Sequence, residues 1–245
     1  MNFIVTADDF GMSSSVNGAI VRAIALGHAS HTSVLATSDG LEAASELARS
    51  NGFADRVGLH LDLSWGVPLT DAVRRSSRFC RDGRFTPLSR GRTLVPLSGD
   101  ERRAIAGEVG AQIERARRCG LAVRHLDSHQ HSHIAPNIAT VVAAAAKALS
   151  IERVRLARVV PQASLVSGVF KRCYNGWLRR RGLTTMSHFG TVDELIDLAE
   201  RGRLTGPFEA MIHPTLDDRH VVIDAASLRP LDELLAPLAS LGSRL

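Results

Sequence analysis

The feature that most constrains the fold is an alternation, along the whole chain, of short apolar segments and longer amphipathic ones. Short apolar runs are typical of buried strands, and a 3.6-residue apolar period is typical of helices. Regular alternation of the two predicts parallel strands covered by helices. The expected strands cover residues 2–6, 32–36, 56–63, 122–127, 153–156, 185–189 and 209–212.

Segments with a helical pattern separate these strands. The expected helices cover residues 15–26, 41–49, 99–119, 136–149, 164–181, 192–201 and 225–239. Ser13 to Ser15 offer N-caps to the first helix, and Gly27 stands where a C-cap belongs. About seven βα units, without a repeat or a Pro/Ser-rich linker, predict an α/β fold with a single domain over residues 1–245. We expect a distorted, TIM-barrel-like (β/α) barrel of about seven parallel strands.

Residues 64–98 interrupt the alternation. Their periodicity is weak, and Gly, Pro, Ser and Arg recur throughout. A segment of this length inside a compact domain is commonly functional or mobile. Because it follows the third strand, we expect an irregular loop that covers the rim of the barrel and shapes a pocket there. The alternative is a mobile insertion away from the site.

The charge balance does not favour a nucleic-acid partner. The net charge is +5, but the basic residues are spread thinly except at 179–181, and no aromatic residues alternate with them. The three cysteines are far apart and form no C-x-x-C pair, which indicates a reducing compartment. With acids at positions 8 and 9 and no apolar run near ~20 residues, we expect a cytoplasmic protein without a signal peptide or transmembrane helix.

Titratable side chains gather where four predicted strands end. In a parallel barrel, the carboxyl ends of the strands form one rim, and active sites are built there. We therefore expect these side chains, distant in sequence, to meet at one mouth. They are Asp8, Asp9, His60, Asp62, His125, Asp127, His129, His131, His133 and His213.

The segment RHLDSHQHSH, residues 124–133, contains four of the ten histidines. Histidine is a common ligand for divalent metals, especially beside carboxylates. The tract therefore predicts a metal site, with His129, His131 and His133 all open as ligands. The alternative is an exposed loop that happens to be rich in histidine. His125 lies within the strand, and we interpret it as a core or supporting histidine.

Asp8 and Asp9 follow a buried strand, where two carboxylates are costly unless a cation or hydrogen bonds compensate them. One can ligate a metal while the other faces the substrate; the alternative is a helix cap. His60 alternates with apolar neighbours, so it is either a ligand or a core residue. His213 has no adjacent His or Cys and suits proton transfer. Together they suggest metal-assisted hydrolysis.

Several motifs occur in an order that resembles a known family. They are TADDFGMS, VNGAI, TSVLA, VGLHLDLSWGVPL, HLDSHQHSH and MIHP, and they extend over residues 1–214. The sequence resembles the YdjC-like carbohydrate deacetylases, a family that includes chitooligosaccharide deacetylases and hopanoid-biosynthesis-associated proteins. The resemblance implies a distorted (β/α) barrel, a divalent cation (Mg²⁺ or Zn²⁺) and removal of an N-acetyl group from an amino sugar.

The resemblance also implies roles for particular residues. Asp9, His60 and His129 match the metal positions of the family. Asp8 matches the base and His213 the acid, and the two aspartates could exchange roles. The alternative function is a metal- or carbohydrate-binding relative without catalysis. The sequence leaves a homodimer open, and contact with a membrane surface if the sugar is lipid-linked.

Three segments depart from the family pattern. Gln130 stands where the family often has histidine, so that position supplies no essential ligand. Thr215 follows Pro214 where the family usually has glycine. Residues 155–159 read RLARV where the family has Arg-Leu-Pro-x-Glu. The missing glutamate and the added Arg158 favour an anionic or lipid-linked sugar over neutral chitobiose.

Overall fold

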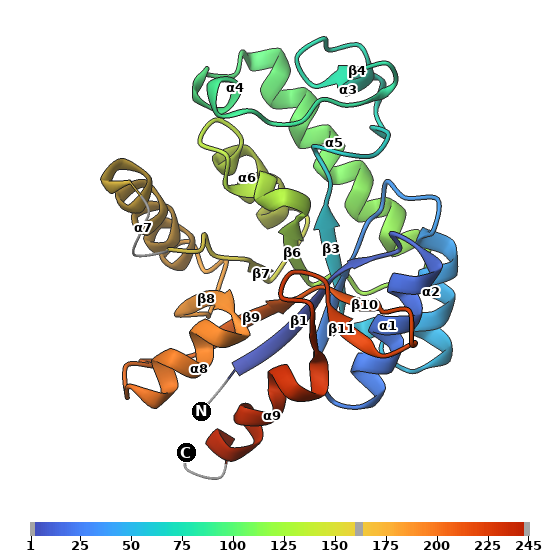
Figure 1. The fold of residues 1–245 in the computed structure, drawn as a ribbon. Coiled ribbons are helices and arrows are strands. Elements are labelled where there is room, and N and C mark those ends of the chain that lie inside the picture. The colour runs from blue at the N-terminus through green and yellow to red at the C-terminus, as the bar shows by residue number, and fades with distance from the viewer. Residues whose placement is uncertain (1–2, 160–163, 243–245) are drawn as a thin grey trace.

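The computed structural model describes residues 3–159 and 164–242, and a seven-stranded sheet forms its centre (Figure 1). The strands are β1 (Phe3–Phe10), β2 (His31–Val34), β3 (Val57–Leu61), β6 (His125–Ser128), β7 (Arg153–Val154), β8 (His188–Thr191) and β9 (Phe208–Ile212). Their order is β7-β6-β3-β2-β1-β9-β8. Every neighbouring pair is parallel, as predicted.

The sheet curls into a barrel that is incompletely closed. In the described part of the chain, β7 and β8 are its edges, and no ladder joins them. Near this gap a backbone hydrogen bond of 2.6 Å runs from Val154 N to Leu183 O. The predicted distorted barrel is therefore confirmed in the form of a curled, partly open sheet. Its parallel order brings the carboxyl ends of β1, β3, β6 and β9 to one mouth.

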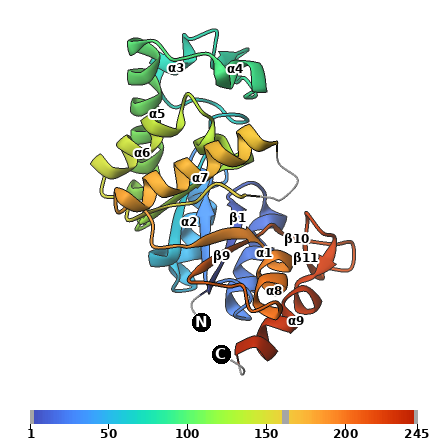
Figure 2. The ribbon, with the colours of Figure 1, turned by 90° about the vertical axis from the view of Figure 1, so that its left-hand side faces the viewer.

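Helices surround the sheet, as Figures 1 and 2 show. The longer ones are α1 (Ser14–Ala25), α2 (Leu41–Ser50), α5 (Gly99–Arg118), α6 (Ala139–Ala148), α7 (Leu165–Arg180), α8 (Val192–Glu200) and α9 (Leu231–Gly242). Two short 3₁₀ segments are η1 (Ala54–Arg56) and η2 (His129–Ile134). As predicted, Ser13 caps α1, with its side chain accepting from Val16 N. Ser98 and Glu101 form a capping box at α5.

The core between the helices and the sheet is built largely from small and aliphatic side chains. Val34, Leu59 and Leu126 on the strands are buried, as are Ala143 and Ala146 on α6. Small residues let α6 lie close to its neighbours, which suits a chain with only 4% aromatic residues. Among the described residues, no helix has the length and apolar character needed to span a membrane.

Residues 64–98, here called the excursion, are folded rather than irregular, so the sequence prediction is wrong on this point. They contain α3 (Asp71–Arg74), β4 (Cys80–Arg81), β5 (Arg84–Phe85) and α4 (Arg90–Leu94), at the top of Figure 1 beside α5. Buried Glu108 of α5 accepts hydrogen bonds from Leu69 N and Thr70 N, at 2.9 and 2.8 Å. Such short elements have too few residues for a periodic pattern.

The C-terminal region also differs from the prediction. A second, antiparallel sheet contains β10 (Pro214–Leu216), β11 (Val222–Asp224) and β12 (Arg229–Pro230). The helix predicted over 225–239 therefore begins only at Leu231. Two local features prevent an earlier start: Asp224 accepts from Ser227 N in a turn, and Leu228 has a φ of 59°.

Smaller differences concern element ends. The first predicted strand, 2–6, begins outside the described residues and continues to Phe10, so the two aspartates lie inside β1. The helix predicted from residue 136 starts at Ala139, and the strand predicted over 185–189 covers His188–Thr191.

Candidate active site

The backbone of β1 is irregular where the two aspartates lie. Its pairing with β2 shifts register between Ala7 and Phe10, and Asp9 has a φ of 68°. Adjacent residues of a regular strand point to opposite faces. The irregularity removes that restriction, and the carboxylates of Asp8 and Asp9 both lie near His60. A positive φ is rare except for Gly, Asn and Asp, so the residue type suits the conformation.

Asp9, His60 and His129 form a cluster, here called the triad. Asp9 Oδ1 lies 3.1 Å from His60 Nε2 and 2.9 Å from His129 Nδ1. The donor atoms of the three residues all lie within 4.8 Å of one another. The structure therefore brings together the three side chains that the sequence analysis proposed as metal ligands. Burial alone would raise the pKa of Asp9, but hydrogen bonds from the two imidazoles outweigh it and lower that pKa.

The surroundings of His60 fit a metal ligand. Its Nδ1 lies 2.7 Å from Asp127 Oδ1 and 3.1 Å from Ser33 Oγ, which leaves Nε2 for the triad. Histidines that bind metals commonly hold a carboxylate through their other ring nitrogen. Burial by itself would lower the pKa of His60, but the neighbouring carboxylates, Asp127 first, raise it to about 10. Two imidazoles and one carboxylate suit a borderline divalent cation such as Zn²⁺.

Asp8 has a different partner. Both of its oxygens accept hydrogen bonds from the buried Arg155, Oδ2 from Nη1 at 2.6 Å and Oδ1 from Nη2 at 2.8 Å. Burial would raise the pKa of Asp8, but the guanidinium of Arg155 outweighs it and lowers that pKa. Asp8 is thus a fixed, ionised carboxylate beside the triad.

Arg155 is the centre of a buried network that the sequence analysis did not predict. Its Nη2 lies 2.7 Å from Asp127 Oδ2, and its Nε donates to Glu209 Oε1 at 2.9 Å. Its guanidinium also lies 4.9 Å from the centre of the Phe189 ring. One signal was available, since an arginine inside a short buried strand needs anionic partners. Nothing in the sequence indicates which carboxylates those are.

His213 follows β9 and lies on the Asp8 side of the mouth. Its Nε2 is 3.9 Å from Asp8 Oδ2, and its Nδ1 is 4.0 Å from Asp224 Oδ1. Asp224 also accepts a hydrogen bond from the backbone N of His213 at 2.7 Å. The ring is partly exposed, so it can reach a bound molecule.

The remaining histidines of the tract lie outside the triad. His133 uses both ring nitrogens, with Nδ1 2.6 Å from Ser128 Oγ and Nε2 3.1 Å from Arg155 O, and burial lowers its pKa to about 3. The His131 ring lies 5.9 Å from that of Phe189, and burial with the nearby Arg155 lowers its pKa to about 4. His125 is buried near His31, as expected for a core histidine.

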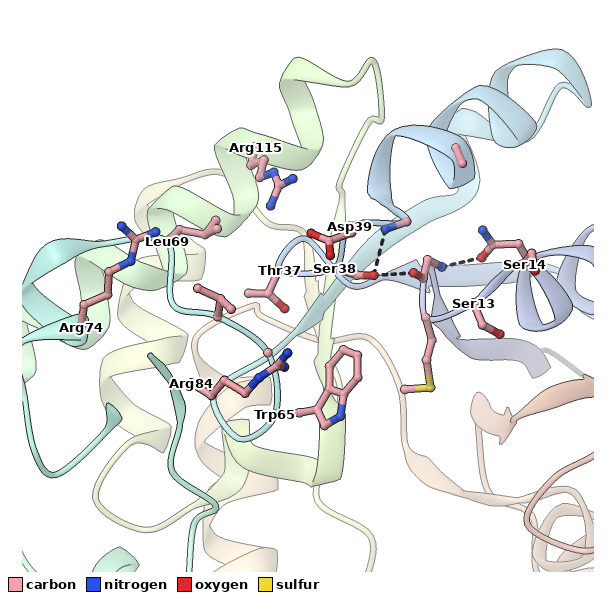
Figure 3. Close-up of a pocket in the computed structure, with 17 residues that line it drawn as sticks. Ser13, Ser14, Thr37, Ser38, Asp39, Trp65, Leu69, Arg74, Arg84 and Arg115 are labelled. Carbon is pink, nitrogen blue, oxygen red and sulfur yellow. Dashed lines mark hydrogen bonds between the residues drawn. The ribbon is translucent and has the colours of Figure 1, made fainter. Parts of the chain in front are cut away.

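Figure 3 shows a cavity of about 670 Å³, one of whose lining residues, Trp65, has its ring 6.1 Å from the ring of His129. Its lining comes from the loops after β1 and β2 and from the excursion, together with residues of α1, α2 and α5. Ser38 Oγ donates to Gly11 O at 2.5 Å and accepts from Gly40 N at 3.0 Å, which joins the first two loops. A Cβ on Gly40 would lie 2.3 Å from Gly11 O, so this close approach requires glycine. Asp62, grouped with the rim residues above, holds the loop of Trp65 and Gly66 through its carboxylate.

Comparison with known proteins gives consistent matches over most of the chain. A carbohydrate deacetylase of Oceanobacillus iheyensis is 30% identical over 214 residues, which cover 82% of this chain and 89% of the relative. A carbohydrate deacetylase of Geobacillus stearothermophilus is 35% identical over 220 residues, 88% of this chain and 80% of the relative. A chitooligosaccharide deacetylase of Klebsiella pneumoniae is 31% identical over 238 residues, 94% of this chain and 88% of the relative.

A solved structure supports the fold. The crystal structure of a putative cellobiose-phosphate cleavage protein from Enterococcus faecalis matches with a TM-score of 0.75 at 21% identity, covering 98% of this chain and 95% of that one. The family profile described as YdjC-like protein matches residues 2–237. With relatives at 30% identity or more over most of both chains, this match shows that the chain belongs to the YdjC-like protein family.

Proposed function

We propose that this protein is a metal-dependent carbohydrate deacetylase, which hydrolyses the N-acetyl group of an amino sugar. The observation that carries the proposal is the triad of Asp9, His60 and His129 beside two further titratable groups, Asp8 and His213. The relatives named carbohydrate deacetylase support the reaction class.

The triad would hold the cation through one carboxylate and two imidazoles, and of Mg²⁺ and Zn²⁺ this donor set favours Zn²⁺. A divalent cation bound there would activate water and polarise the acetyl carbonyl. Asp127 keeps the His60 ring in the orientation that presents Nε2 to the triad.

Asp8 and His213 move the protons. Asp8 accepts a proton from the attacking water, while Arg155 holds the carboxylate in place. His213 donates a proton from Nε2 to the sugar nitrogen as the C–N bond breaks, so the products are acetate and a free amino sugar. The 3.9 Å between His213 Nε2 and Asp8 Oδ2 allows base and acid to act on one small amide group.

The test is acetate release from a panel of N-acetylated sugars, measured with purified, chelator-treated and Zn²⁺- or Mg²⁺-reloaded protein. We expect release from at least one sugar, loss after chelation and recovery on reloading. Bound metal also raises the melting temperature, because only the folded chain presents the triad. Metal binding without acetate release from any sugar would instead support the non-catalytic binding relative.

The proposal includes a cytoplasmic location. Cys80, Cys119 and Cys173 are all free thiols, which fits a reducing compartment. A homodimer and contact with a membrane surface stay predictions from the sequence.

A further inference from the structure

Exposed apolar side chains gather on one part of the surface, at α4 of the excursion and at the start of α7. Leu94 is 72% exposed, Leu165 80% and Val166 79%, and Val95 and Val169 beside them are exposed as well. Single exposed apolar residues are ordinary, but a group of them marks a surface that binds a partner or a membrane. These five residues are here called the α4–α7 face.

A groove of about 860 Å³ connects the two helices of this face. Leu94 of α4 and Val166 of α7 both line it, so residues far apart in the sequence border one surface. In Figure 1 both helices lie on the side of the molecule away from α1 and α2. Gln130 and His131 also line the groove, which therefore lies beside η2, the segment that starts with the triad residue His129.

The surroundings of the α4–α7 face are basic and lack acids. Every residue that lines the groove belongs to one of three segments, 83–99, 128–151 and 153–192, and none of these contains Asp or Glu. The last segment alone contains eight of the 30 Lys and Arg residues. Within the described ranges 3–159 and 164–242, Lys171 and Arg172 of α7 have no hydrogen-bond or ion-pair partner. Their charges are thus available to an anionic surface.

Projecting aliphatic side chains beside unpaired cations suit an anionic membrane. Helices that bind membrane surfaces combine apolar side chains with Lys and Arg, and anionic lipids attract the basic residues. The centres of protein interfaces are instead enriched in aromatic residues, Met and Arg, whereas the α4–α7 face consists of Leu and Val alone. A twofold dimer through this face would also place its unpaired cations opposite one another.

We propose that the α4–α7 face binds the surface of an anionic phospholipid bilayer. Leu94, Leu165 and Val166 enter the boundary between headgroups and acyl chains. Lys171 and Arg172 contact the anionic headgroups. The proposal goes beyond the proposed function, because docking requires no reaction at the triad. It brings the mouth of the barrel, through η2, close to the bilayer.

The test is co-sedimentation of the protein with vesicles of phosphatidylcholine alone or of phosphatidylcholine mixed with phosphatidylglycerol. We expect binding to the mixed vesicles, weakened by added salt, and at least tenfold weaker binding to the neutral ones. Leu165→Asp with Val166→Asp should lower binding to the mixed vesicles more than ~10-fold, and Leu94→Asp tests the face from the other helix. Lys171→Gln with Arg172→Gln should lower it by about 30-fold, because each basic residue contributes separately.

Matched controls make the same changes elsewhere. Leu26→Asp alters a leucine that is 55% exposed at the end of α1. Arg56→Gln with Arg118→Gln removes two charges near the amino ends of β3 and β6. Both controls should bind the mixed vesicles as wild type does, and all variants should keep the wild-type melting temperature.

Three results would overturn the proposal. They are absence of binding to mixed vesicles, equal binding to both kinds of vesicle, and wild-type binding by the variants of the α4–α7 face. A dimer in analytical ultracentrifugation that Leu165→Asp with Val166→Asp dissociates would also overturn it, because the face would then join two copies of the chain. Acetate release from soluble sugars is measured separately, so failure of the docking proposal and failure of the proposed function are distinguishable.

Discussion

Asp8 and Asp9 are neighbours in β1, yet their carboxylates have different partners. Asp9 lies between two imidazoles, at 3.1 and 2.9 Å. Asp8 accepts two hydrogen bonds from Arg155. The mouth of the barrel therefore has a triad half and an arginine half. In the arginine half a guanidinium of the chain itself compensates the acids, whereas the triad half is where we propose that a cation binds.

Several buried acids can share one site when each carboxylate has a compensating partner. Buried carboxylates need compensation, and each half supplies it differently. Because Arg155 is permanently charged, its half is compensated whenever the chain is folded. With the proposed cation, the compensation of the triad half would depend on metal supply and on the protonation of its histidines. Changes in the two halves should thus affect different measurements.

The largest expected effect separates the two aspartates by activity. Asp8→Asn should keep the metal and lower turnover by about 10²–10⁴-fold, because an amide cannot accept the proton. Asp9→Asn should weaken metal binding, and excess metal should restore part of the rate. Acetate release and metal content after gel filtration measure both effects. Metal lost in Asp8→Asn and kept in Asp9→Asn would exchange the two roles.

The next effect concerns stability. Arg155→Met would leave Asp8, Asp127 and Glu209 without their shared cation, so the free energy of unfolding should fall by about 3–5 kcal/mol. Urea denaturation of the metal-free protein measures it. The control is Arg158→Met, whose half-exposed pair with Glu194 should cost no more than about 1 kcal/mol. Similar losses in both variants would contradict a special role for the arginine half.

A third effect tests which histidine of the tract binds the metal. His129→Ala should weaken Zn²⁺ binding by more than ~100-fold, since two protein ligands remain. His131→Ala should change it little, because that ring lies against Phe189. Isothermal titration with Zn²⁺ compares them. If His131→Ala removes the metal and His129→Ala keeps it, the triad is assigned to the wrong side chain.

The smallest effect tests Asp127, which lies between the triad half and the arginine half. Asp127 contacts both, with Oδ1 at His60 and Oδ2 at Arg155. Asp127→Asn should weaken Zn²⁺ binding by about 10–100-fold, as for other residues that orient a ligand. Ser33→Ala removes only the longer contact to His60 and should have a weaker effect on the same titration. A larger loss for Ser33→Ala than for Asp127→Asn would show that the carboxylate does not orient the ring.

The alternation of apolar runs was enough to predict the parallel strands and most helices, because burial imposes a period on those segments. The same pattern did not predict the short helices and strands of the excursion. The backbone of the excursion at Leu69 is held by Glu108, a buried acid on α5 that looks like a solvent-facing residue in the sequence. The helix over 225–239 was predicted six residues too early because the φ of Leu228 leaves no trace in composition.

The candidate site, like the fold, could be predicted only in part from the sequence. The carboxyl ends of parallel strands meet at one rim, and this expectation together with the family resemblance identified Asp9, His60 and His129 as neighbours. The structure brings their donor atoms together. The sequence did not reveal that Arg155 pairs with Asp8, since 147 positions separate them and no periodicity connects them. The choice of His129 over His133 depends on the turn after β6, where Gln130 and His131 have φ near +50°.

The left-handed backbone at Asp9 also limits how this site could be redesigned. A protein engineer who wishes to change which cation the proposed site binds must choose side chains that each position tolerates. Residue 9 accepts Asp, Asn or Gly readily, whereas a β-branched residue there would strain the chain. His60 and His129 are not among the residues with a positive φ, so a wider choice of ligands is open to them. New metal chemistry is therefore better sought at the two imidazoles, with the short carboxylate kept as a fixed point.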